Sequence, residues 1–245
     1  MDIIRANERQ ALGHGPFQIR RIRPGMKLGN SDDLGFGPLG LIDHANLGPG
    51  LLVPMHEHRN DEILSYLRSG TLWHEDTHGG RLPMSATQLV VMNAGSGISH
   101  EESIPDDGES VEMLQIFIRP SEANLAPNIQ SHRFESATSN DEWRLIAGPA
   151  ESNAPLSVRN KVWVYDRRIV SGAIDVPFES KLDSFLYVFS GAIRIVSDVV
   201  LSAGDSFTIA AGDEFPVLIA IEPCDLVLFR VDRHANFSRA GTLSG

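Results

Sequence analysis

Short runs of branched and aromatic residues, each bounded by glycine, proline, asparagine or aspartate, recur along the whole 245-residue chain. Such runs are typical of β-strands separated by tight turns, and 22 glycines and 14 prolines disfavour long helices. We therefore predict an all-β protein built from sandwiches or barrels. The predicted strands cover residues 39–43, 63–67, 89–92, 113–118, 161–165, 185–189, 192–196, 207–210 and 226–231.

The two halves of the chain resemble each other. The segment EILSYLRSG at 62–70 aligns with DSFLYVFSG at 183–191, and VMNAG at 91–95 aligns with TIAAG at 208–212. Both matches occur in the same order and at similar spacing, which indicates a duplicated β-barrel. The polar stretch 119–139 contains two prolines and has no sustained period, so we interpret it as the connection between the halves.

Charge and cysteine content restrict the function classes. The formal net charge is −11, and an acidic surface repels phosphate backbones, so we expect no direct nucleic-acid partner. No apolar stretch approaches the roughly 20 residues that span a bilayer, and the first residues lack a secretory signal, so we expect no membrane partner. A single cysteine, Cys224, fits a reducing compartment, and we predict a cytoplasmic protein.

Two short clusters carry the chemistry. On a β-strand, residues two apart point to the same face, so His56 and His58 project into one space. His100 and Glu102 repeat this spacing, and Glu62 lies on the first face if that strand stays regular. If the two strands face each other inside a barrel, three imidazole nitrogens and one carboxylate converge. A mixed set of this kind suits Fe(II), Mn(II), Ni(II), Cu(II) or Zn(II).

A lone His-x-His pair on a strand is more often incidental than metal-binding. The second cluster and the glycines before each one favour a metal site here, because glycines permit tight turns into a strand. Among the other histidines, we expect His74 and His78 to flank a hairpin turn in solvent. His44 is a candidate for lining the pocket, not for binding the metal.

The spacing G50-x5-H56-x-H58-x3-E62-x7-G70 resembles the first cupin motif. The segment MNAGSGISHEE at 92–102 is similar to the second motif in its pirin form, and QIFIRPSEANLAP at 115–127 and RANER at 5–9 also resemble pirins. The chain is thus identified as a member of the pirin family, nearest to the bacterial pirin-like proteins described as quercetin dioxygenases. The resemblance implies a bicupin, with two jelly-roll barrels in one chain.

The resemblance also implies a ligand set. Pirins hold one metal ion in the N-terminal barrel through three histidines and a glutamate, which fall on His56, His58, His100 and Glu102. We expect one divalent transition-metal ion, with Fe(II) favoured and Mn, Ni, Cu and Zn as alternatives. The predicted domains are residues 1–130, which bind the metal, and residues 131–245, which do not, because no histidine lies between His132 and His234.

Two functions of different classes follow. One is a dioxygenase acting on a flavonol-type or related enol or catechol, with Glu102 and Glu62 as candidate catalytic residues. The other is a metal-dependent regulatory protein that binds a protein partner without turnover. The partner is accordingly a small-molecule substrate or a protein, and the sequence leaves the oligomeric state open.

Overall fold

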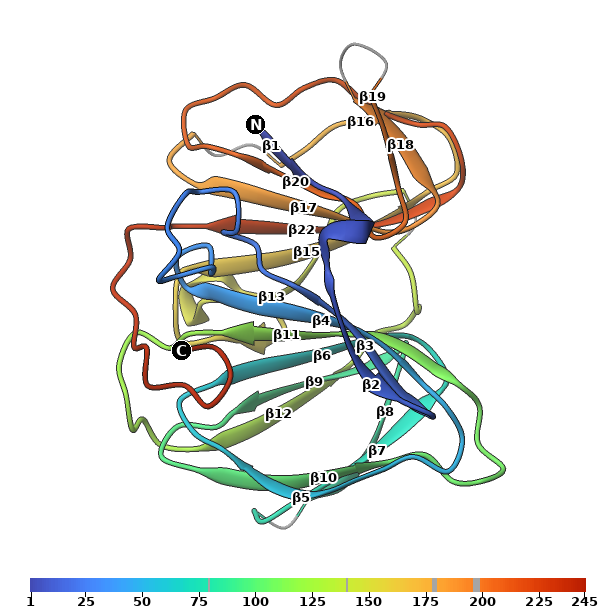
Figure 1. Ribbon diagram of the computed structural model, residues 1–245, viewed down its shortest axis with the longest axis vertical. Helices are drawn as coiled ribbons and strands as arrows, with labels where there is room; N and C mark the ends of the chain where they lie inside the picture. The colour runs from blue at the N-terminus through green and yellow to red at the C-terminus, as the bar shows by residue number, and fades with distance from the viewer. Residues whose placement is uncertain (79, 140, 178–179, 196–198) are drawn as a thin grey trace.

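In the computed structural model the chain is almost entirely β-structure (Figure 1). The structure describes residues 1–245 except 79, 140, 178–179 and 196–198. Within the described residues, the helical elements are two short 3-10 turns, η1 (Ala6–Glu8) and η2 (Ala150–Ser152). No helix among those residues is long and apolar enough to cross a membrane. The predicted all-β fold is confirmed.

The N-terminal half forms one strongly curled sheet, in the lower part of Figure 1. Its strand order is β2-β3-β4-β11-β6-β9-β8-β7-β10-β5, and β12 pairs with β9. The strands are β2 (Gln10–His14), β3 (Phe17–Ile22), β4 (Leu39–Leu47), β5 (Leu52–His58), β6 (Glu62–Ser69), β7 (Thr71–Asp76), β8 (Arg81–Ser85), β9 (Gln88–Asn93), β10 (Ile98–Ser103), β11 (Val111–Ile118) and β12 (Asn128–Arg133).

The C-terminal half forms two sheets, in the upper part of Figure 1. The larger has the order β1-β20-β17-β22-β15-β13-β14 and includes the N-terminal strand β1, and the smaller has the order β16-β21-β18-β19. The strands are β1 (Asp2–Ile4), β13 (Arg144–Gly148), β14 (Leu156–Ser157), β15 (Val162–Ile169), β16 (Gly172–Ile174), β17 (Asp183–Ser190), β18 (Ala192–Ile195), β19 (Val199–Ser202), β20 (Ser206–Ile209), β21 (Leu218–Ala220) and β22 (Cys224–Val231).

The predicted strands match observed ones, except that Val196 lies outside the described residues. The duplication is visible in the strand order, because β4-β11-β6-β9 in one half corresponds to β15-β22-β17-β20 in the other. Gly70 and Gly191 follow the equivalent strands β6 and β17 with φ of 70° and 75°. A side chain at Gly191 would also place a Cβ 2.1 Å from a backbone oxygen, so both conformation and space require glycine.

The stretch 119–139 is more structured than its composition indicates. Asn128–Arg133 pairs with β9 along its whole length, although five of its six side chains are polar and two of those, His132 and Arg133, are ionisable. The backbone of this strand supplies hydrogen bonds that do not depend on an apolar side-chain pattern. The connection between the halves therefore contains a strand of the N-terminal sheet.

A shared hydrophobic core joins the two halves. Leu64 and Tyr66 on β6 belong to the same buried cluster as Phe185 and Tyr187 on β17, while the alternate residue Leu67 points into the N-terminal barrel. The central strands are thus covered on both faces, which explains their nearly continuous apolar runs. The N-terminal barrel has buried clusters of its own, and the ring of the predicted ligand His58 lies 6.1 Å from the ring of Phe117 in one of them.

Candidate metal centre

His56, His58 and His100 come from two hydrogen-bonded neighbours in one sheet. β5 and β10 pair antiparallel with His100 directly opposite His56 and Ile98 opposite His58. The prediction from the sequence required the two strands to face each other inside a barrel, and they meet as adjacent antiparallel strands, which bring opposite side chains within about 5 Å on the same face. The convergence of the three imidazoles stays as predicted.

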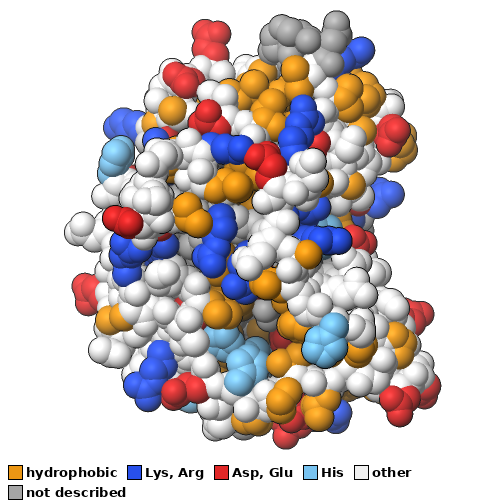
Figure 2. Space-filling model, viewed as in Figure 1, with side chains coloured by type: hydrophobic (Ala, Val, Ile, Leu, Met, Phe, Trp, Pro, Cys, Tyr) orange, Lys and Arg blue, Asp and Glu red, His pale blue; other side chains and the backbone are white. Residues whose placement is uncertain are grey.

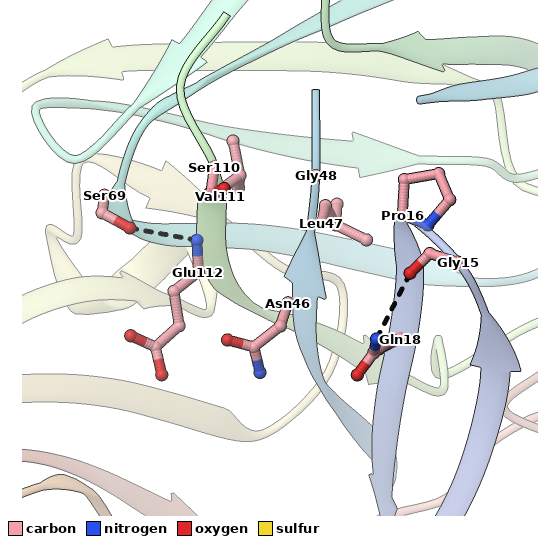
Figure 3. A pocket seen from close by; sticks show the side chains of 10 residues that line it. All are labelled: Gly15, Pro16, Gln18, Asn46, Leu47, Gly48, Ser69, Ser110, Val111 and Glu112. Atoms are coloured by element: carbon pink, nitrogen blue, oxygen red, sulfur yellow. Dashed lines mark hydrogen bonds between the residues drawn. The ribbon is translucent and has the colours of Figure 1, made fainter. Parts of the chain in front are cut away.

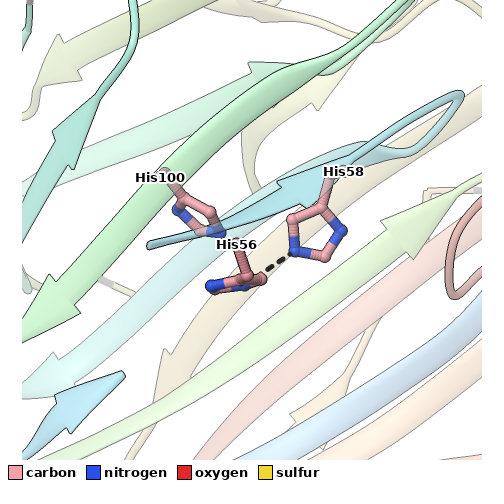
Figure 4. A group of neighbouring side chains, drawn as sticks. All are labelled: His56, His58 and His100. Carbon is pink, nitrogen blue, oxygen red and sulfur yellow. Dashed lines mark hydrogen bonds between the residues drawn. The ribbon is translucent and has the colours of Figure 1, made fainter. Parts of the chain in front are cut away.

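The three imidazoles form a compact group (Figure 4). Their ring centroids are 4.5–5.1 Å apart, and one ring nitrogen from each lies within 4.8 Å of the others. His58 and His100 are buried, whereas His56 is half-buried. Figure 2 shows histidine side chains beside a hollow in the lower half of the molecule, the half formed by the N-terminal sheet. The group is therefore accessible through His56.

In each imidazole, Nδ1 has a partner behind the site. Nδ1 of His56 lies 2.9 Å from the Pro54 carbonyl oxygen, Nδ1 of His58 lies 3.1 Å from Asp61 Oδ2, and Nδ1 of His100 lies 3.2 Å from His74 Nδ1. A neutral imidazole with the proton on Nδ1 keeps a lone pair on Nε2. All three rings can therefore offer Nε2 to the same ion.

The surroundings of the Nε2 atoms suit a transition-metal ion. Nε2 of His56 and Nε2 of His58 point toward each other at 3.1 Å, although neither has a proton to donate when Nδ1 carries it. Nε2 of His100 is buried and has no hydrogen-bond partner among the described residues. Buried polar atoms are almost always partnered, and a transition-metal ion would satisfy all three nitrogens at once.

His74 lies in the candidate site, which the sequence reasoning did not predict. We expected it in solvent, but it is 2% exposed on β7, and its Nε2 lies 3.3 Å from Asp76 Oδ2. On β10, His100 stands opposite Asp76 and Glu102 stands opposite His74, so all four side chains share one face of the sheet. The expectation failed because the pairing of β7 with β10 cannot be seen in the polar sequence around the turn. His78 is exposed, as predicted.

Glu102 is buried beside His74 and His100. A carboxylate oxygen of Glu102 groups with nitrogens of His74 and His100, all within 4.8 Å, and Gln115 Nε2 donates to both carboxylate oxygens at 3.2 and 3.3 Å. The register of β10 against β5 shifts between His100 and Glu102, and such a bulge changes the direction of a side chain next to a functional site. The imidazole trio and Glu102 thus meet at His100.

Burial sets the protonation of the site. Desolvation raises the pKa of Glu102 to about 7, and the nearby His58 only partly opposes it. Desolvation also lowers the pKa of His56, and it lowers the pKa of His100 to about 2 with help from the neighbouring histidines. These imidazoles are therefore neutral near pH 7, which is the form that binds a metal.

Glu62 lies away from the histidine group. β5 ends at His58, and Asn60 with φ of 53° turns the chain before β6, so the regular alternation that would place Glu62 beside His58 is interrupted. The Glu62 carboxylate accepts hydrogen bonds from Asn93 and from Arg159 of the C-terminal half, the latter at 2.6 and 2.8 Å. Asp61, one residue earlier, is the carboxylate that reaches His58.

His44 lies between the two halves, not in the metal group. Its Nδ1 contacts the Tyr187 hydroxyl at 2.6 Å, its Nε2 contacts Glu112 at 3.0 Å, and its ring stacks on Phe189. Glu112 also lines a surface cavity of about 400 Å³ at the ends of β3, β4 and β11 (Figure 3). That cavity contains none of the histidines or carboxylates predicted for the metal site.

Comparisons with known proteins agree with this arrangement. The pirin family model matches residues 34–118. A quercetin 2,3-dioxygenase of Escherichia coli K12 is 28% identical over 161 residues, covering 66% of this chain and 68% of its own. A pirin-like protein of Caulobacter vibrioides is 28% identical over 199 residues, covering 80% and 84%.

Solved structures resemble the whole chain. The crystal structure of YhhW from Escherichia coli superposes with a TM-score of 0.80 at 25% identity, covering 94% of this chain and 97% of that one. Bacterial pirin YhhW in complex with nickel(II) gives 0.78 at 24% identity, covering 94% and 98%. The segment matched by the family model runs from just before β4 to the end of β11 and includes all three clustered histidines. Residues 34–118 of this chain therefore resemble pirins in sequence, and the chain has the fold of the bacterial pirin YhhW.

Proposed function

We propose that this protein is a metal-dependent dioxygenase that acts on a flavonol-type or related enol or catechol molecule. The observation that carries the proposal is the convergence of three Nε2 atoms, each with its Nδ1 partnered from behind, next to a buried carboxylate. The Escherichia coli relative named quercetin 2,3-dioxygenase supports the reaction class. The ligands that we propose are His56, His58, His100 and Glu102, with one ion per chain.

The ion is a divalent transition metal, and we favour Fe(II), with Mn, Ni, Cu and Zn as alternatives. A pirin relative is named for its nickel(II) complex, which supports a transition metal without choosing among them. When bound, such an ion supplies Lewis-acid and redox chemistry that the side chains lack. The half-buried His56 marks the side from which a substrate reaches the site.

We assign proton transfer to Glu102. Glu102 is the buried carboxylate that groups with His100, and a positioned carboxylate would act as a general base once it leaves the ion. The Gln115 amide donates to both carboxylate oxygens and holds their orientation while Glu102 takes a proton from the substrate hydroxyl. Because Glu62 is engaged by Arg159 and Asn93, we propose a single catalytic carboxylate.

The proposal extends to the two halves of the chain. We propose that residues 1–130 form the metal-binding cupin domain and that residues 131–245 form a metal-free one. The sequence from 133 to 233 contains no histidine, so the second half offers no imidazole set. A single cysteine, Cys224, which is buried, supports action in a reducing compartment, and we propose the cytoplasm.

Oxygen consumption tests the proposed reaction. Protein loaded separately with Fe(II), Mn(II), Ni(II), Cu(II) or Zn(II) is mixed with a flavonol, and oxygen uptake is followed together with the loss of the long-wavelength absorbance. At least one metal form should turn over. Glu102→Gln should lower the rate by roughly 10²–10⁴-fold, whereas Glu101→Gln, which alters the opposite face of the same strand, should not.

A second function, binding of a protein partner without turnover, is favoured by one observation. Leu52 and Met55 on β5, the strand of His56, are 58% and 48% exposed, and exposed apolar side chains beside a site mark contact surfaces. If no metal form consumes oxygen with flavonols or simple catechols, the dioxygenase proposal is abandoned in favour of this one. A metal-dependent change in partner binding that Met55→Ser weakens would then support it.

A further inference from the structure

A strap of the chain, residues 240–244, crosses the turn between β5 and β6. The Thr242 amide donates to the Arg59 carbonyl oxygen at 3.0 Å, and the Arg59 amide donates to the Thr242 hydroxyl at 2.8 Å. Asn60 Nδ2 donates to the Ala240 carbonyl oxygen at 3.3 Å. The strap therefore lies on the residues that directly follow His58. In Figure 1 it is the red segment that returns to the lower half of the molecule.

The strap ends on the carboxylate that holds His58. Asp61 is fully buried, and its Oδ1 accepts hydrogen bonds from the Ser244 amide at 3.0 Å and the Ser244 hydroxyl at 2.6 Å. Its Oδ2 accepts from the Leu243 amide at 3.2 Å and faces His58 Nδ1 at 3.1 Å. A buried carboxylate without enough hydrogen-bond donors is strongly unfavourable, so these three donors from the strap hold the Asp61 carboxylate in place.

The strap is itself held firmly. The Ser244 carbonyl oxygen accepts from Arg119 Nε at 2.5 Å, and the same guanidinium forms a two-pronged ion pair with Asp33 at 2.7 and 2.9 Å. Leu243 packs against the apolar cluster of Leu41, Ile63, Met92, Ile98 and Phe117. A Cβ at Gly241 would lie 2.3 Å from the Ser244 hydroxyl and 2.5 Å from Asp61 Oδ1, so the approach requires glycine.

We infer that the strap is a positioning element of the metal centre. Ser244 and the Leu243 amide orient the Asp61 carboxylate. Asp61 accepts a hydrogen bond from His58 Nδ1–H, which keeps the lone pair of His58 Nε2 free and aimed at the ion. The inference rests on the proposed metal site and does not depend on the dioxygenase reaction. By linkage, metal binding at His58 and docking of the strap stabilise each other.

Nickel(II) affinity, measured on the full chain by competition with a chelator, tests the inference. Partners behind a metal ligand typically contribute 10–100-fold to affinity, so Ser244→Ala should weaken nickel(II) binding by roughly tenfold. Arg239→Ala is the matched control. Arg239 directly precedes the strap, and its side chain donates a hydrogen bond to the Asp32 carbonyl oxygen, not to Asp61. This variant should bind nickel(II) as the unmodified protein does.

Three further measurements separate positioning from general loss of stability. In an Asp61→Asn background, Ser244→Ala should change affinity no further, because both act on the same contact. Nitrogen NMR of the metal-free protein should show His58 with its proton on Nδ1, and Ser244→Ala should mix the two tautomers. Nickel(II) should slow hydrogen exchange at the Leu243 and Ser244 amides in the unmodified protein.

The inference is overturned if folded Ser244→Ala, or a folded variant lacking residues 241–245, binds nickel(II) with unchanged affinity and keeps the His58 tautomer. If the shortened variant does not fold, the Ser244→Ala result decides. Failure of the unmodified protein to bind any divalent metal would instead overturn the proposed metal site. Nickel(II) binding with the predicted Ser244 effect but no oxygen consumption would support the strap and leave only the dioxygenase proposal refuted.

Discussion

His74 Nδ1 lies 3.2 Å from His100 Nδ1, and on the far side of the His74 ring Nε2 lies 3.3 Å from Asp76 Oδ2. Protons can be placed in this row in only one way that leaves His100 Nε2 free. His100 Nδ1–H donates to His74 Nδ1, and His74 then carries its own proton on Nε2, beside Asp76 Oδ2 but without hydrogen-bond geometry to it. The row is a carboxylate–histidine arrangement behind a metal ligand, extended by one imidazole.

The first prediction concerns His74. His74→Phe keeps a ring of similar size but removes the acceptor for His100 Nδ1–H, so metal affinity should fall by roughly 10–100-fold. His74→Asn retains an amide oxygen that can accept and should lose less. Titration against a chelator measures both, with His78→Ala, on the exposed turn after β7, as the control. Equal affinity for the Phe variant and the unmodified protein would show that the row has no role in metal binding.

The second prediction concerns the ligands. Elemental analysis of freshly purified protein should find about one transition-metal ion per chain, because the described residues offer one connected group of histidines. His56→Ala combined with His58→Ala should abolish it, whereas His132→Ala should not. A full equivalent of metal in the double variant would refute the site.

Much of the fold and part of the site could be predicted from the sequence, for identifiable reasons. The branched run of β6 ends at Gly70, and the run of β17 ends at Gly191, so the repeat was visible in local pattern alone. His56 and His58 could be paired because the two-residue period of a strand is independent of the surroundings. Their convergence with His100 needed only that two such strands share a barrel.

The remaining features depend on contacts between distant segments. The role of His74 follows from the register of β7 against β10, which nothing in the polar residues around the turn specifies. The sequence pattern predicts Glu62 as a site residue. In the structure, the turn at Asn60 directs its side chain toward Arg159, 97 positions later. The contact of Ser244 with Asp61 spans 183 positions. Tertiary packing, not local pattern, decides these placements.

The third prediction tests whether Glu62 is structural. Arg159→Met should lower the free energy of unfolding by about 3 kcal/mol, because removing one partner of a buried ion pair leaves an uncompensated charge. Metal affinity should not change, since Glu62 bonds to Asn93 and Arg159 and lies outside the histidine groups that the described residues form. Denaturant unfolding and metal titration on the same samples measure the two effects. A large loss of affinity without a loss of stability would return Glu62 to the metal site.

The last prediction concerns pH and follows from Glu102. Because burial raises the pKa of Glu102 to about 7, the metal-free protein carries a proton there below pH 7 that a metal ion must displace. Affinity should therefore fall by about tenfold for each pH unit from 7 to 5. His56 and His100 contribute little to this slope, because burial lowers the pKa of both. Glu102→Gln should bind more weakly at pH 8 and show a nearly flat dependence.

For the stability of the metal-free protein, Glu102 predicts a pH dependence of the opposite sign. The pKa of Glu102 is raised from 4.5 in a model environment, so its contribution to stability is present below pH 4.5 and lost as pH rises through 7. The pKa of His100 is lowered from 6.5, so its contribution is present above pH 6.5 and lost as pH falls. Glu102→Gln removes only the first effect. The metal-free variant should therefore be more stable than the unmodified protein at pH 8, by up to about 3 kcal/mol, and should lose this advantage at pH 4.5. Denaturant unfolding at both pH values measures it, and a constant difference between the two proteins would show that Glu102 is already ionised in the metal-free site.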